Sequence, residues 1–211
     1  MKTILITGAA TGIGESLAKL LSNNNKLILT YHQRIPDKIP GADYYQLDIT
    51  NNESIAKFFS KIKNKYSTID VLVNNAAICL DKLFIESSFA EIDQQINTNL
   101  SGLIKTTYQF LPIVREKIIN IGSECSKITY PEYSTYCATK FGVRGFTQAL
   151  ATEATELKIY CANPGPTSTK MNGFYGTKPE EVAKIIIDNL IESSKLKSGS
   201  DLDIYKMFDI K

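Results

Sequence analysis

Short apolar runs alternate along the chain with longer segments in which apolar residues recur every three or four positions. The short runs are typical of buried strands and lie at residues 2–7, 26–30, 44–48, 69–73, 117–122 and 157–162. The longer segments are typical of helices with one apolar face and lie at residues 12–23, 51–65, 88–111 and 136–156. Pro179 begins a last helix, and residues 202–206 are predicted as a short final strand. This alternation predicts an α/β fold, a doubly wound parallel sheet with helices on both faces.

The segment between the second and third predicted strands interrupts this alternation. Residues 34–43 contain two prolines and a glycine, so little helix is expected there. The sequence has no internal repeat and no linker-like stretch. We therefore expect residues 1–211 to form a single domain.

Charge and composition argue against several classes of protein. The chain has 24 basic and 22 acidic residues, a net charge of +2, and the two signs are interspersed, which is not the pattern of a nucleic-acid-binding protein. No stretch approaches the roughly 20 consecutive apolar residues of a membrane span, and the N-terminus lacks the features of a secretory signal, so no membrane association is expected. Four cysteines without a CxxC pair and a single histidine predict no metal site and a reduced, cytoplasmic setting.

A glycine-rich turn joins the first predicted strand to the first predicted helix. It reads Thr7-Gly8-Ala9-Ala10-Thr11-Gly12-Ile13-Gly14. Glycines let the backbone turn tightly and approach a pyrophosphate, whose negative charge is favoured at a helix N-terminus. The turn therefore predicts a dinucleotide site, with candidate contacts from Gly8, Thr11, Gly12, Ile13 and Gly14. The alternative is a glycine turn that binds no ligand.

A second group of candidate residues follows the fifth predicted strand. Tyr136 and Lys140 are four residues apart, which places both on one face of a helix, and Ser123 comes directly after the strand. A tyrosine has an unperturbed pKa of about 10, and a nearby ammonium group favours its ionised form. These residue types suit the reduction of a carbonyl group, which needs a proton donor at the developing alkoxide. Taken singly, each of them could serve a structural role.

The order of these motifs resembles that of the short-chain dehydrogenase/reductase family, and among its members the 3-oxoacyl carrier-protein reductases in particular. Asn74-Asn75-Ala76-Ala77 follows the fourth strand, then come Ser123, the YxxxK pair and a Pro-Gly turn at Asn163-Pro164-Gly165. The resemblance implies a single Rossmann-type domain. In it, residues 1–122 mainly bind the coenzyme, and residues 123–211 carry the catalytic groups and a short substrate lid.

The resemblance also implies roles for the candidate catalytic residues. Tyr136 is expected to act as the general acid in reduction and as the general base in oxidation. Lys140 is expected to lower the pKa of Tyr136 and to hold the nicotinamide ribose. Ser123 is expected to orient the substrate oxygen, and Asn99 to hold a water molecule that links Lys140 to solvent.

Further coenzyme contacts are implied by the same resemblance. Asp48 is expected to hydrogen-bond the adenine, with help from the backbone of Ile49. Tyr136 and Lys140 are expected to touch the coenzyme as well as the substrate. The remaining candidates line the coenzyme pocket or close over the nicotinamide: Asn74, Asn75, Ala76, Pro164, Gly165, Thr167 and Thr169.

The end of the second predicted strand bears on the choice of coenzyme. NAD sites commonly place an acid there for the ribose 2′-hydroxyl, but Thr30-Tyr31-His32-Gln33-Arg34 contains none. Arg34, together with His32, is expected to supply positive charge and hydrogen bonds to a 2′-phosphate. This predicts that NADP(H) is favoured over NAD(H). The alternative is that Arg34 is a solvated loop residue.

The chain departs from the family pattern near its C-terminus. Only residues 170–178 separate Thr169 from Pro179, so the substrate lid is short. A short lid implies an open site, a large or carrier-bound substrate, or a lid supplied by a neighbouring subunit. The tail at residues 201–205 lacks the glycine-rich ending common in the family. By resemblance we expect a homodimer, formed through the two long helices, or a homotetramer.

Together these features predict an NADP(H)-preferring oxidoreductase. It would transfer hydride between nicotinamide and the carbonyl or secondary alcohol of a small-molecule or carrier-bound substrate. The alternatives are an NAD-linked alcohol dehydrogenase of the same family and a coenzyme-sensing regulator without turnover. Cys79, Cys125 and Cys137 lie near the motifs and are interpreted as small structural residues.

Overall fold

A seven-stranded parallel sheet forms the centre of the protein. The computed structural model describes residues 1–193 and 195–208. The sheet has the order β3-β2-β1-β4-β5-β6-β7, which confirms the predicted doubly wound α/β fold. The strands are β1 (Thr3–Ile6), β2 (Lys26–Tyr31), β3 (Asp43–Gln46), β4 (Ile69–Asn74), β5 (Val114–Ile121), β6 (Lys158–Asn163) and β7 (Asp201–Asp203).

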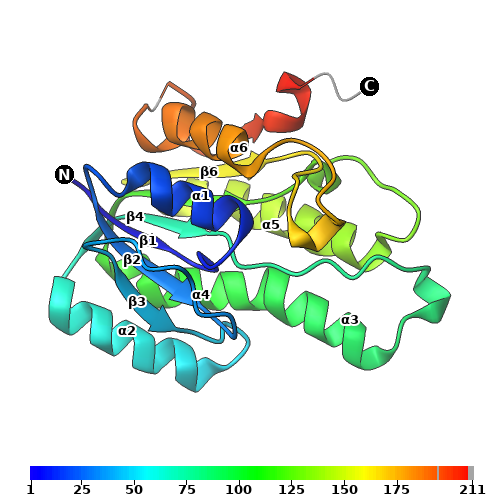
Figure 1. The fold of residues 1–211 in the computed structure, drawn as a ribbon, viewed down its shortest axis with the longest axis horizontal. Helices are drawn as coiled ribbons and strands as arrows, with labels where there is room; N and C mark the ends of the chain where they lie inside the picture. The colour runs from blue at the N-terminus through cyan, green and yellow to red at the C-terminus, as the bar shows by residue number, and fades with distance from the viewer. Residues whose placement is uncertain (194, 209–211) are drawn as a thin grey trace.

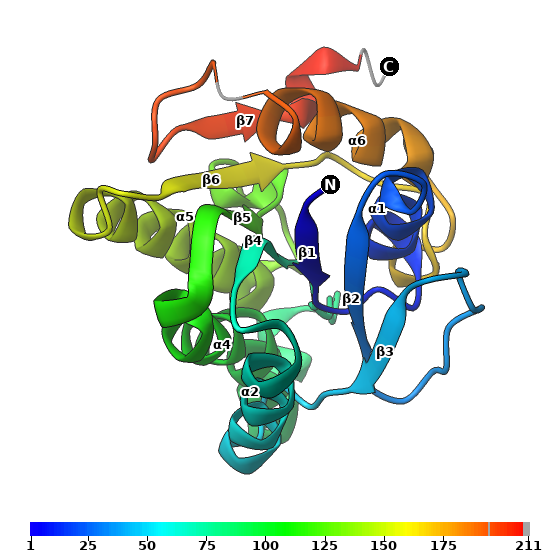
Figure 2. The ribbon, with the colours of Figure 1, turned by 90° about the vertical axis from the view of Figure 1, so that its left-hand side faces the viewer.

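Helices cover both faces of this sheet, as Figures 1 and 2 show. The first and last helices, α1 and α6, pack together on one face, and α2, α4 and α5 lie on the other. The helices are α1 (Gly12–Leu21), α2 (Asn52–Tyr66), α3 (Phe89–Ile96), α4 (Leu103–Phe110), α5 (Ser134–Glu153) and α6 (Pro179–Ile186). Within the described ranges, no helix is both long enough and apolar enough to cross a membrane.

The central strands are apolar throughout because both of their faces are buried. In β1, Ile4 and Ile6 contact the cluster that contains Leu17 of α1, whereas Leu5 points to the opposite cluster with Phe110 of α4. Successive side chains of a strand point to opposite faces, so a continuous apolar run is what a sheet covered on both sides requires.

The connection between β2 and β3 contains no helix, as the prolines in it predicted. Ile39 and Ala42 from this connection, and Tyr44 of β3, pack against the same core face as α1. The Tyr44 hydroxyl accepts a hydrogen bond from the Ile39 backbone N–H and donates one to the Asp37 carbonyl oxygen. These contacts let a loop cover part of the sheet.

Most predicted boundaries differ from the structure by one to three residues, and three differences have a clear structural meaning. β5 begins at Val114, which pairs with Ile69 of β4, three residues earlier than predicted. The charged residues Arg115 and Glu116 interrupt the apolar pattern there, so the sequence did not indicate a strand. The long helix predicted at residues 88–111 is divided by a π-helical segment at Asn97–Gly102. The predicted final strand at 202–206 stops at Asp203, and a 3₁₀ turn follows it.

Candidate active site

The predicted site residues meet at the carboxyl ends of the parallel strands. The glycine turn follows β1, residues 75–77 follow β4, Ser123 follows β5, and the Pro-Gly turn follows β6. Between β1 and β4 the order of the sheet reverses direction, and ligands of open α/β sheets bind at such a switch point.

Gly8 and Gly14 let the backbone of the glycine turn pack directly against the segment after β4. A Cβ atom on Gly8 would lie 2.8 Å from Cα of Ala76, and Gly8 has a φ of +65° that favours glycine. A Cβ atom on Gly14 would lie 2.5 Å from Nδ2 of Asn75. The two predicted coenzyme segments are thus in contact, and side chains at these glycines would separate them.

The start of α1 fits the pyrophosphate of a dinucleotide. Thr11 occupies the N-cap position, but in the structure its side chain makes no capping hydrogen bond to the helix. The first N–H groups of a helix have no partner within the helix, and they carry the positive end of its dipole. An anion bound beside Gly12 and Ile13 would satisfy these donors.

Thr7 ties the two coenzyme segments together, a role that the sequence analysis did not assign to it. Its Oγ1 accepts hydrogen bonds from the backbone N–H groups of Asn75, at 3.0 Å, and Ala76, at 3.1 Å. Nδ2 of Asn75 in turn donates to the carbonyl oxygens of Thr7 and Gly8, both at 3.0 Å. A buried hydroxyl at the end of a strand needs a hydrogen-bond partner, and this requirement is the feature of the sequence that could have indicated the role of Thr7.

Asn74, predicted to line the coenzyme pocket, lies within the sheet. Its Nδ2 donates to Thr107 Oγ1 and to Asn120 Oδ1, both at 2.8 Å, and the residue is buried. The bond to Asn120 joins β4 to β5, and the bond to Thr107 joins β4 to α4. Asn74 therefore supports the strands beneath the site.

Tyr136 and Lys140 lie together near the end of β5. Both side chains are buried, and the Lys140 Nζ atom lies 5.5 Å from the centre of the Tyr136 ring. Nζ donates a hydrogen bond of 2.9 Å to the Ile121 carbonyl oxygen. An ammonium group has three donors, and Ile121 is the one acceptor recorded for Nζ among the described residues. The remaining donors fit a sugar hydroxyl of the coenzyme.

Burial favours the neutral form of both side chains, the protonated phenol and the unprotonated amine. Burial raises the pKa of Tyr136 above its ordinary value, and the Ser123 hydroxyl beside the phenol offsets only part of the effect. Burial also lowers the pKa of Lys140 to about 8. Burial thus opposes the expected lowering of the Tyr136 pKa by Lys140, which stays a prediction.

Asn99 lies in the π-helical segment and fastens the chain after β4. Its Oδ1 accepts from the Ile78 backbone N–H at 2.8 Å, and its Nδ2 donates to the Ile78 carbonyl at 2.7 Å. Four residues earlier, Gln95 Oε1 accepts from the Leu80 N–H at 2.6 Å. Within the described chain, the recorded bonds of the Asn99 side chain do not include Lys140, so its water-holding role stays a prediction.

The turn after β6 reaches the glycine turn. A Cβ atom on Gly12 would lie 3.0 Å from Cγ2 of Thr169, so the segments predicted to hold the pyrophosphate and the nicotinamide touch. Thr167 is buried, and its hydroxyl donates to the Gly165 carbonyl oxygen at 3.0 Å. Pro164 contributes its carbonyl oxygen to the Glu124 N–H at 2.7 Å, which links this turn to the Ser123 turn.

Two of the residues predicted to hold the adenosine, Asp48 and His32, lie near each other. The Asp48 carboxylate accepts hydrogen bonds from the Thr50 N–H and hydroxyl, which hold its pKa below the usual value although burial opposes this. His32 Nε2 is 3.8 Å from the other Asp48 oxygen. Ile49 is buried, and its carbonyl oxygen faces Gly102 of the π-helical segment. Arg34 is exposed on the loop after β2.

Three cysteines lie near the site, and burial keeps two of them, Cys79 and Cys125, as protonated thiols. Cys125 and Cys137 are buried in a cluster with Tyr136, and Cys79 packs against it. Burial raises the pKa of Cys79 and of Cys125 to about 12. This agrees with the interpretation of these residues as small structural groups.

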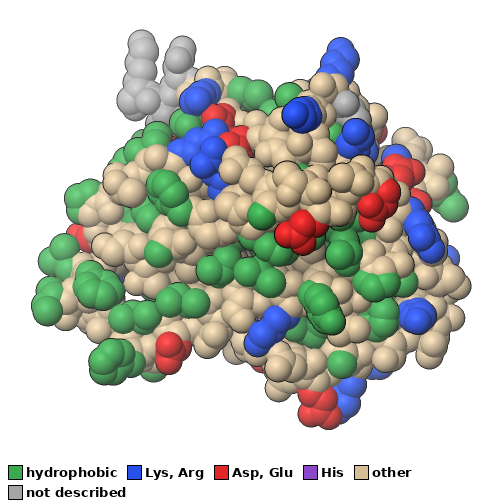
Figure 3. Space-filling view, turned by 180° about the vertical axis from the view of Figure 1, so that it is seen from behind, with side chains coloured by type: hydrophobic (Ala, Val, Ile, Leu, Met, Phe, Trp, Pro, Cys, Tyr) green, Lys and Arg blue, Asp and Glu red, His purple; other side chains and the backbone are tan. Residues whose placement is uncertain are grey.

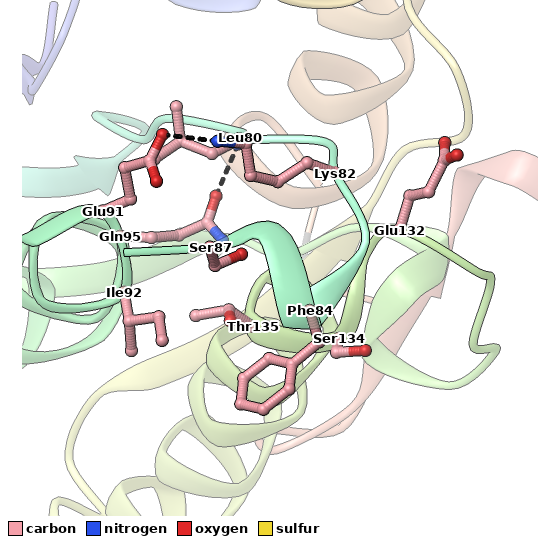
Figure 4. Close-up of a pocket in the computed structure, with 10 residues that line it drawn as sticks. All are labelled: Leu80, Lys82, Phe84, Ser87, Glu91, Ile92, Gln95, Glu132, Ser134 and Thr135. Carbon is pink, nitrogen blue, oxygen red and sulfur yellow. Dashed lines mark hydrogen bonds and ion pairs between the residues drawn. The ribbon is translucent and has the colours of Figure 1, made fainter. Parts of the chain in front are cut away.

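A shallow open hollow lies next to the site, between α3, the start of α5 and the loop at residues 80–87 (Figure 4). The Lys82–Glu91 ion pair and the bond from Leu80 to Gln95 cross one side of it. None of the predicted site residues lines this hollow. It is therefore separate from the position predicted for the substrate carbonyl.

The chain is similar in sequence and in structure to several known proteins. A family model described as short chain dehydrogenase matches residues 2–180. A 3-oxoacyl-[acyl-carrier-protein] reductase of Thermotoga maritima is 29% identical over 236 residues, covering 96% of each chain. An NADP-dependent 3-hydroxy acid dehydrogenase of Schizosaccharomyces pombe is 31% identical, covering 88% of this chain and 85% of its own. A short chain dehydrogenase from Burkholderia cenocepacia, solved in complex with NADP, superimposes with a TM-score of 0.85 at 22% identity and 96% coverage of both chains.

Proposed function

The chain belongs to the short chain dehydrogenase family, and we propose that it prefers NADP(H) and uses Tyr136 as its general acid and base. It is an NAD(P)-dependent oxidoreductase that acts on CH–OH and C=O groups. The observation that carries the proposal is that Ser123 and Lys140 both lie against Tyr136. They lie at the same end of the sheet as the N-terminus of α1, where the Thr11 side chain makes no capping hydrogen bond. The coenzyme would supply the hydride, and the protein would manage the proton and the orientation of the substrate.

The protonation of Tyr136 favours reduction. Because burial raises its pKa, the phenol carries its proton at neutral pH, which is the state a general acid requires. As an alkoxide forms on the substrate, Tyr136 would donate this proton to the oxygen. Ser123 would hold the same oxygen by a hydrogen bond, since its hydroxyl lies beside the phenol. In oxidation the phenolate would take the proton back.

Lys140 would act on both the coenzyme and Tyr136. Its Nζ is anchored by Ile121 and has donors left for the nicotinamide ribose. When Lys140 is protonated, its charge near the ring stabilises the phenolate that forms after proton transfer. Asn99 would contribute by keeping the segment after β4 in place and by holding a water molecule for proton exchange.

The preference for NADP(H) is supported by the charges at the end of β2. This strand ends without an acid, and the exposed Arg34 and His32 follow it. A carboxylate there would repel a 2′-phosphate, whereas a guanidinium group binds phosphate through paired hydrogen bonds. The NADP named for one relative and for one structural neighbour supports the same choice.

The substrate would be a ketone or 3-oxo compound, small or bound to a carrier. The carrier-protein reductase among the relatives supports this class. The lid is short and is closed on itself, since the Thr177 N–H donates to Pro166 and the Ser168 N–H donates to Thr177. Phe174 and Tyr175 at its tip are 70% and 60% exposed, so these two aromatic rings are not packed into the core.

A homodimer through the long helices is supported by exposed apolar side chains on them. Phe89, Ile96, Tyr108 and Phe141 are exposed on the segments that form the two long helices. Figure 3 views the molecule from behind and shows apolar side chains on this side. Burying such a surface against a second copy is favourable.

A nucleotide titration tests the proposal. The chain contains no tryptophan, so the fluorescence of NADPH and NADH can be followed directly. We expect tight NADPH binding, weak NADH binding, and NADPH oxidation with at least one ketone of a panel that includes ethyl acetoacetate. Tighter NADH binding would identify an NAD-linked dehydrogenase. Binding without turnover of any ketone would favour a coenzyme-sensing regulator.

A further inference from the structure

Charged groups from three distant parts of the chain meet beside β7. Asp201 Oδ2 lies 2.8 Å from Lys127 Nζ and 2.8 Å from Arg144 Nε. Asp203 accepts from Lys127 Nζ and from Lys206 Nζ, both at 2.9 Å. The side chains of Asp201 and Asp203 are only 10% and 15% exposed. Nothing in the reaction described above uses these groups, although Lys127 is four residues from Ser123.

Asp203, unlike Asp201, also accepts a hydrogen bond from the end of β6. Nδ2 of Asn163, the last residue of β6, donates to Asp203 Oδ1 at 3.1 Å. An ionised carboxylate can only accept hydrogen bonds, so Asp203 requires the amide nitrogen of Asn163 to point toward it. Although burial opposes ionisation, the bonds from Lys127, Lys206 and Asn163 hold the pKa of Asp203 below its usual value.

The other end of the same amide faces the turn that carries Ser123. With its nitrogen toward Asp203, Asn163 presents Oδ1 to the Cys161 thiol, which donates at 3.2 Å. A Cβ atom on Gly122 would lie only 2.2 Å from this oxygen, so the amide oxygen packs closely against the backbone before Ser123. Asn163 is fully buried and precedes the Pro164-Gly165 turn.

We propose that Asp203 is a positioning residue that orients the Asn163 amide and thereby holds the turn after β6 in the position that contacts the nicotinamide. This inference rests on the proposed function, because that turn is assigned to the nicotinamide only there. The C-terminal strand, where the family resemblance is weakest, would thus act on the coenzyme without touching it.

The test compares coenzyme binding with and without the nicotinamide ring. Calorimetric titrations with NADPH and with 2′-phospho-ADP-ribose, which lacks only that ring, are made for the wild type and for Asp203→Ala. We expect Asp203→Ala to weaken NADPH binding by about tenfold, as for the loss of one charge-assisted hydrogen bond, and to leave 2′-phospho-ADP-ribose binding unchanged. If the wild type binds NADH more tightly, NADH and ADP-ribose are the matched pair.

Two further variants separate this effect from general damage. Asp203→Asn keeps an oxygen for Asn163 and is expected to restore NADPH binding to within about twofold of the wild type, since the lost ion pairs are not in contact with the turn. Asp201→Asn removes charge from the same cluster but does not touch Asn163, so both affinities should stay unchanged. If Asp203→Ala does not fold, Asn163→Ala, which leaves the ion pairs in place, should show the same selective loss.

Several outcomes would overturn the inference. An equal loss for both ligands, no loss for either, or a selective loss in Asp201→Asn would show that Asp203 does not act through Asn163. A defect in Asp203→Asn as large as that of Asp203→Ala would have the same meaning. If the wild type binds neither nucleotide, the proposed function fails, and the inference fails with it.

Discussion

The Lys140 ammonium nitrogen lies 5.5 Å from the centre of the Tyr136 ring, and burial shifts the pKa values of the two groups in opposite directions. Burial favours the neutral form of each group, so it keeps the proton on the phenol and weakens the hold of the amine on its proton. A protonated phenol next to a lysine that titrates near neutrality suits a protein that delivers protons to its substrate.

Replacing Tyr136 by phenylalanine removes the proposed proton donor and little else. We expect kcat with a substrate ketone to fall by about 10²–10⁴-fold, the range for general acid catalysis, while NADPH affinity stays within a few fold of the wild type. Tyr133→Phe is the matched control, because its ring lies 6.1 Å from that of Tyr136 in the same cluster. Near-normal turnover by Tyr136→Phe would rule out the assignment.

Lys140 makes stability depend on pH. Its pKa is about 8 in the folded protein, against an ordinary 10.5. Between these values the unfolded chain binds more protons than the folded protein, so the free energy of unfolding rises with pH. Relative to Lys140→Met, the wild type should gain about 3 kcal/mol from below pH 8 to above pH 10.5, since each pKa unit corresponds to about 1.4 kcal/mol.

Denaturant unfolding of both proteins across this pH range measures the difference. Lys184→Met serves as the control, because Lys184 is exposed on α6 and its loss should give no such slope. A constant difference between the wild type and Lys140→Met at all pH values would mean that Lys140 keeps its ordinary pKa in the folded protein.

Gly14 and Gly145 are expected to respond oppositely to substitution by alanine. At Gly14 a methyl group would lie 2.5 Å from Asn75 Nδ2 and 2.7 Å from the Gly8 carbonyl oxygen. Gly14→Ala should therefore lower the free energy of unfolding by about 1–3 kcal/mol and weaken NADPH binding. At Gly145, an exposed position within α5, a methyl group meets nothing within 4 Å, and Gly145→Ala should stabilise the protein by about 0.5–1 kcal/mol. Thermal unfolding and an NADPH titration of both variants test these expectations. If Gly14→Ala changes neither stability nor NADPH affinity, the glycine turn can adjust to the added methyl group.

Arg34 is expected to distinguish the two coenzymes. Arg34→Ala should weaken NADPH binding by about tenfold, as for the loss of a charge-assisted contact, and leave NADH binding unchanged. Lys38→Ala, another exposed cation on the same loop, is the control and should change neither affinity. Equal effects of Arg34→Ala on the two nucleotides would identify Arg34 as a solvated loop residue.

Several contacts of the site depend on residues that carry no recognisable motif. Thr7 joins the turn after β1 to the segment after β4, residues that are 68 positions apart in the chain. Gln95 looks like a polar residue on an amphipathic helix, yet it is buried and holds the Leu80 N–H. No local pattern distinguishes such residues from ordinary polar positions, because their partners are brought close only by the order of the strands.

Features that depend on neighbouring residues can be predicted from the sequence. Alternating apolar runs, prolines between β2 and β3, glycines where the chain must turn, and the four-residue spacing of Tyr136 and Lys140 act locally, so they can be read along the chain. Features that depend on distance and burial follow only from the folded arrangement of the chain. Asn163 meets Asp203 only because β6 and β7 pair in register, 40 residues apart. Tyr136 and Lys140 acquire opposite pKa shifts only because the fold removes both from water, and no spacing in the sequence carries that information.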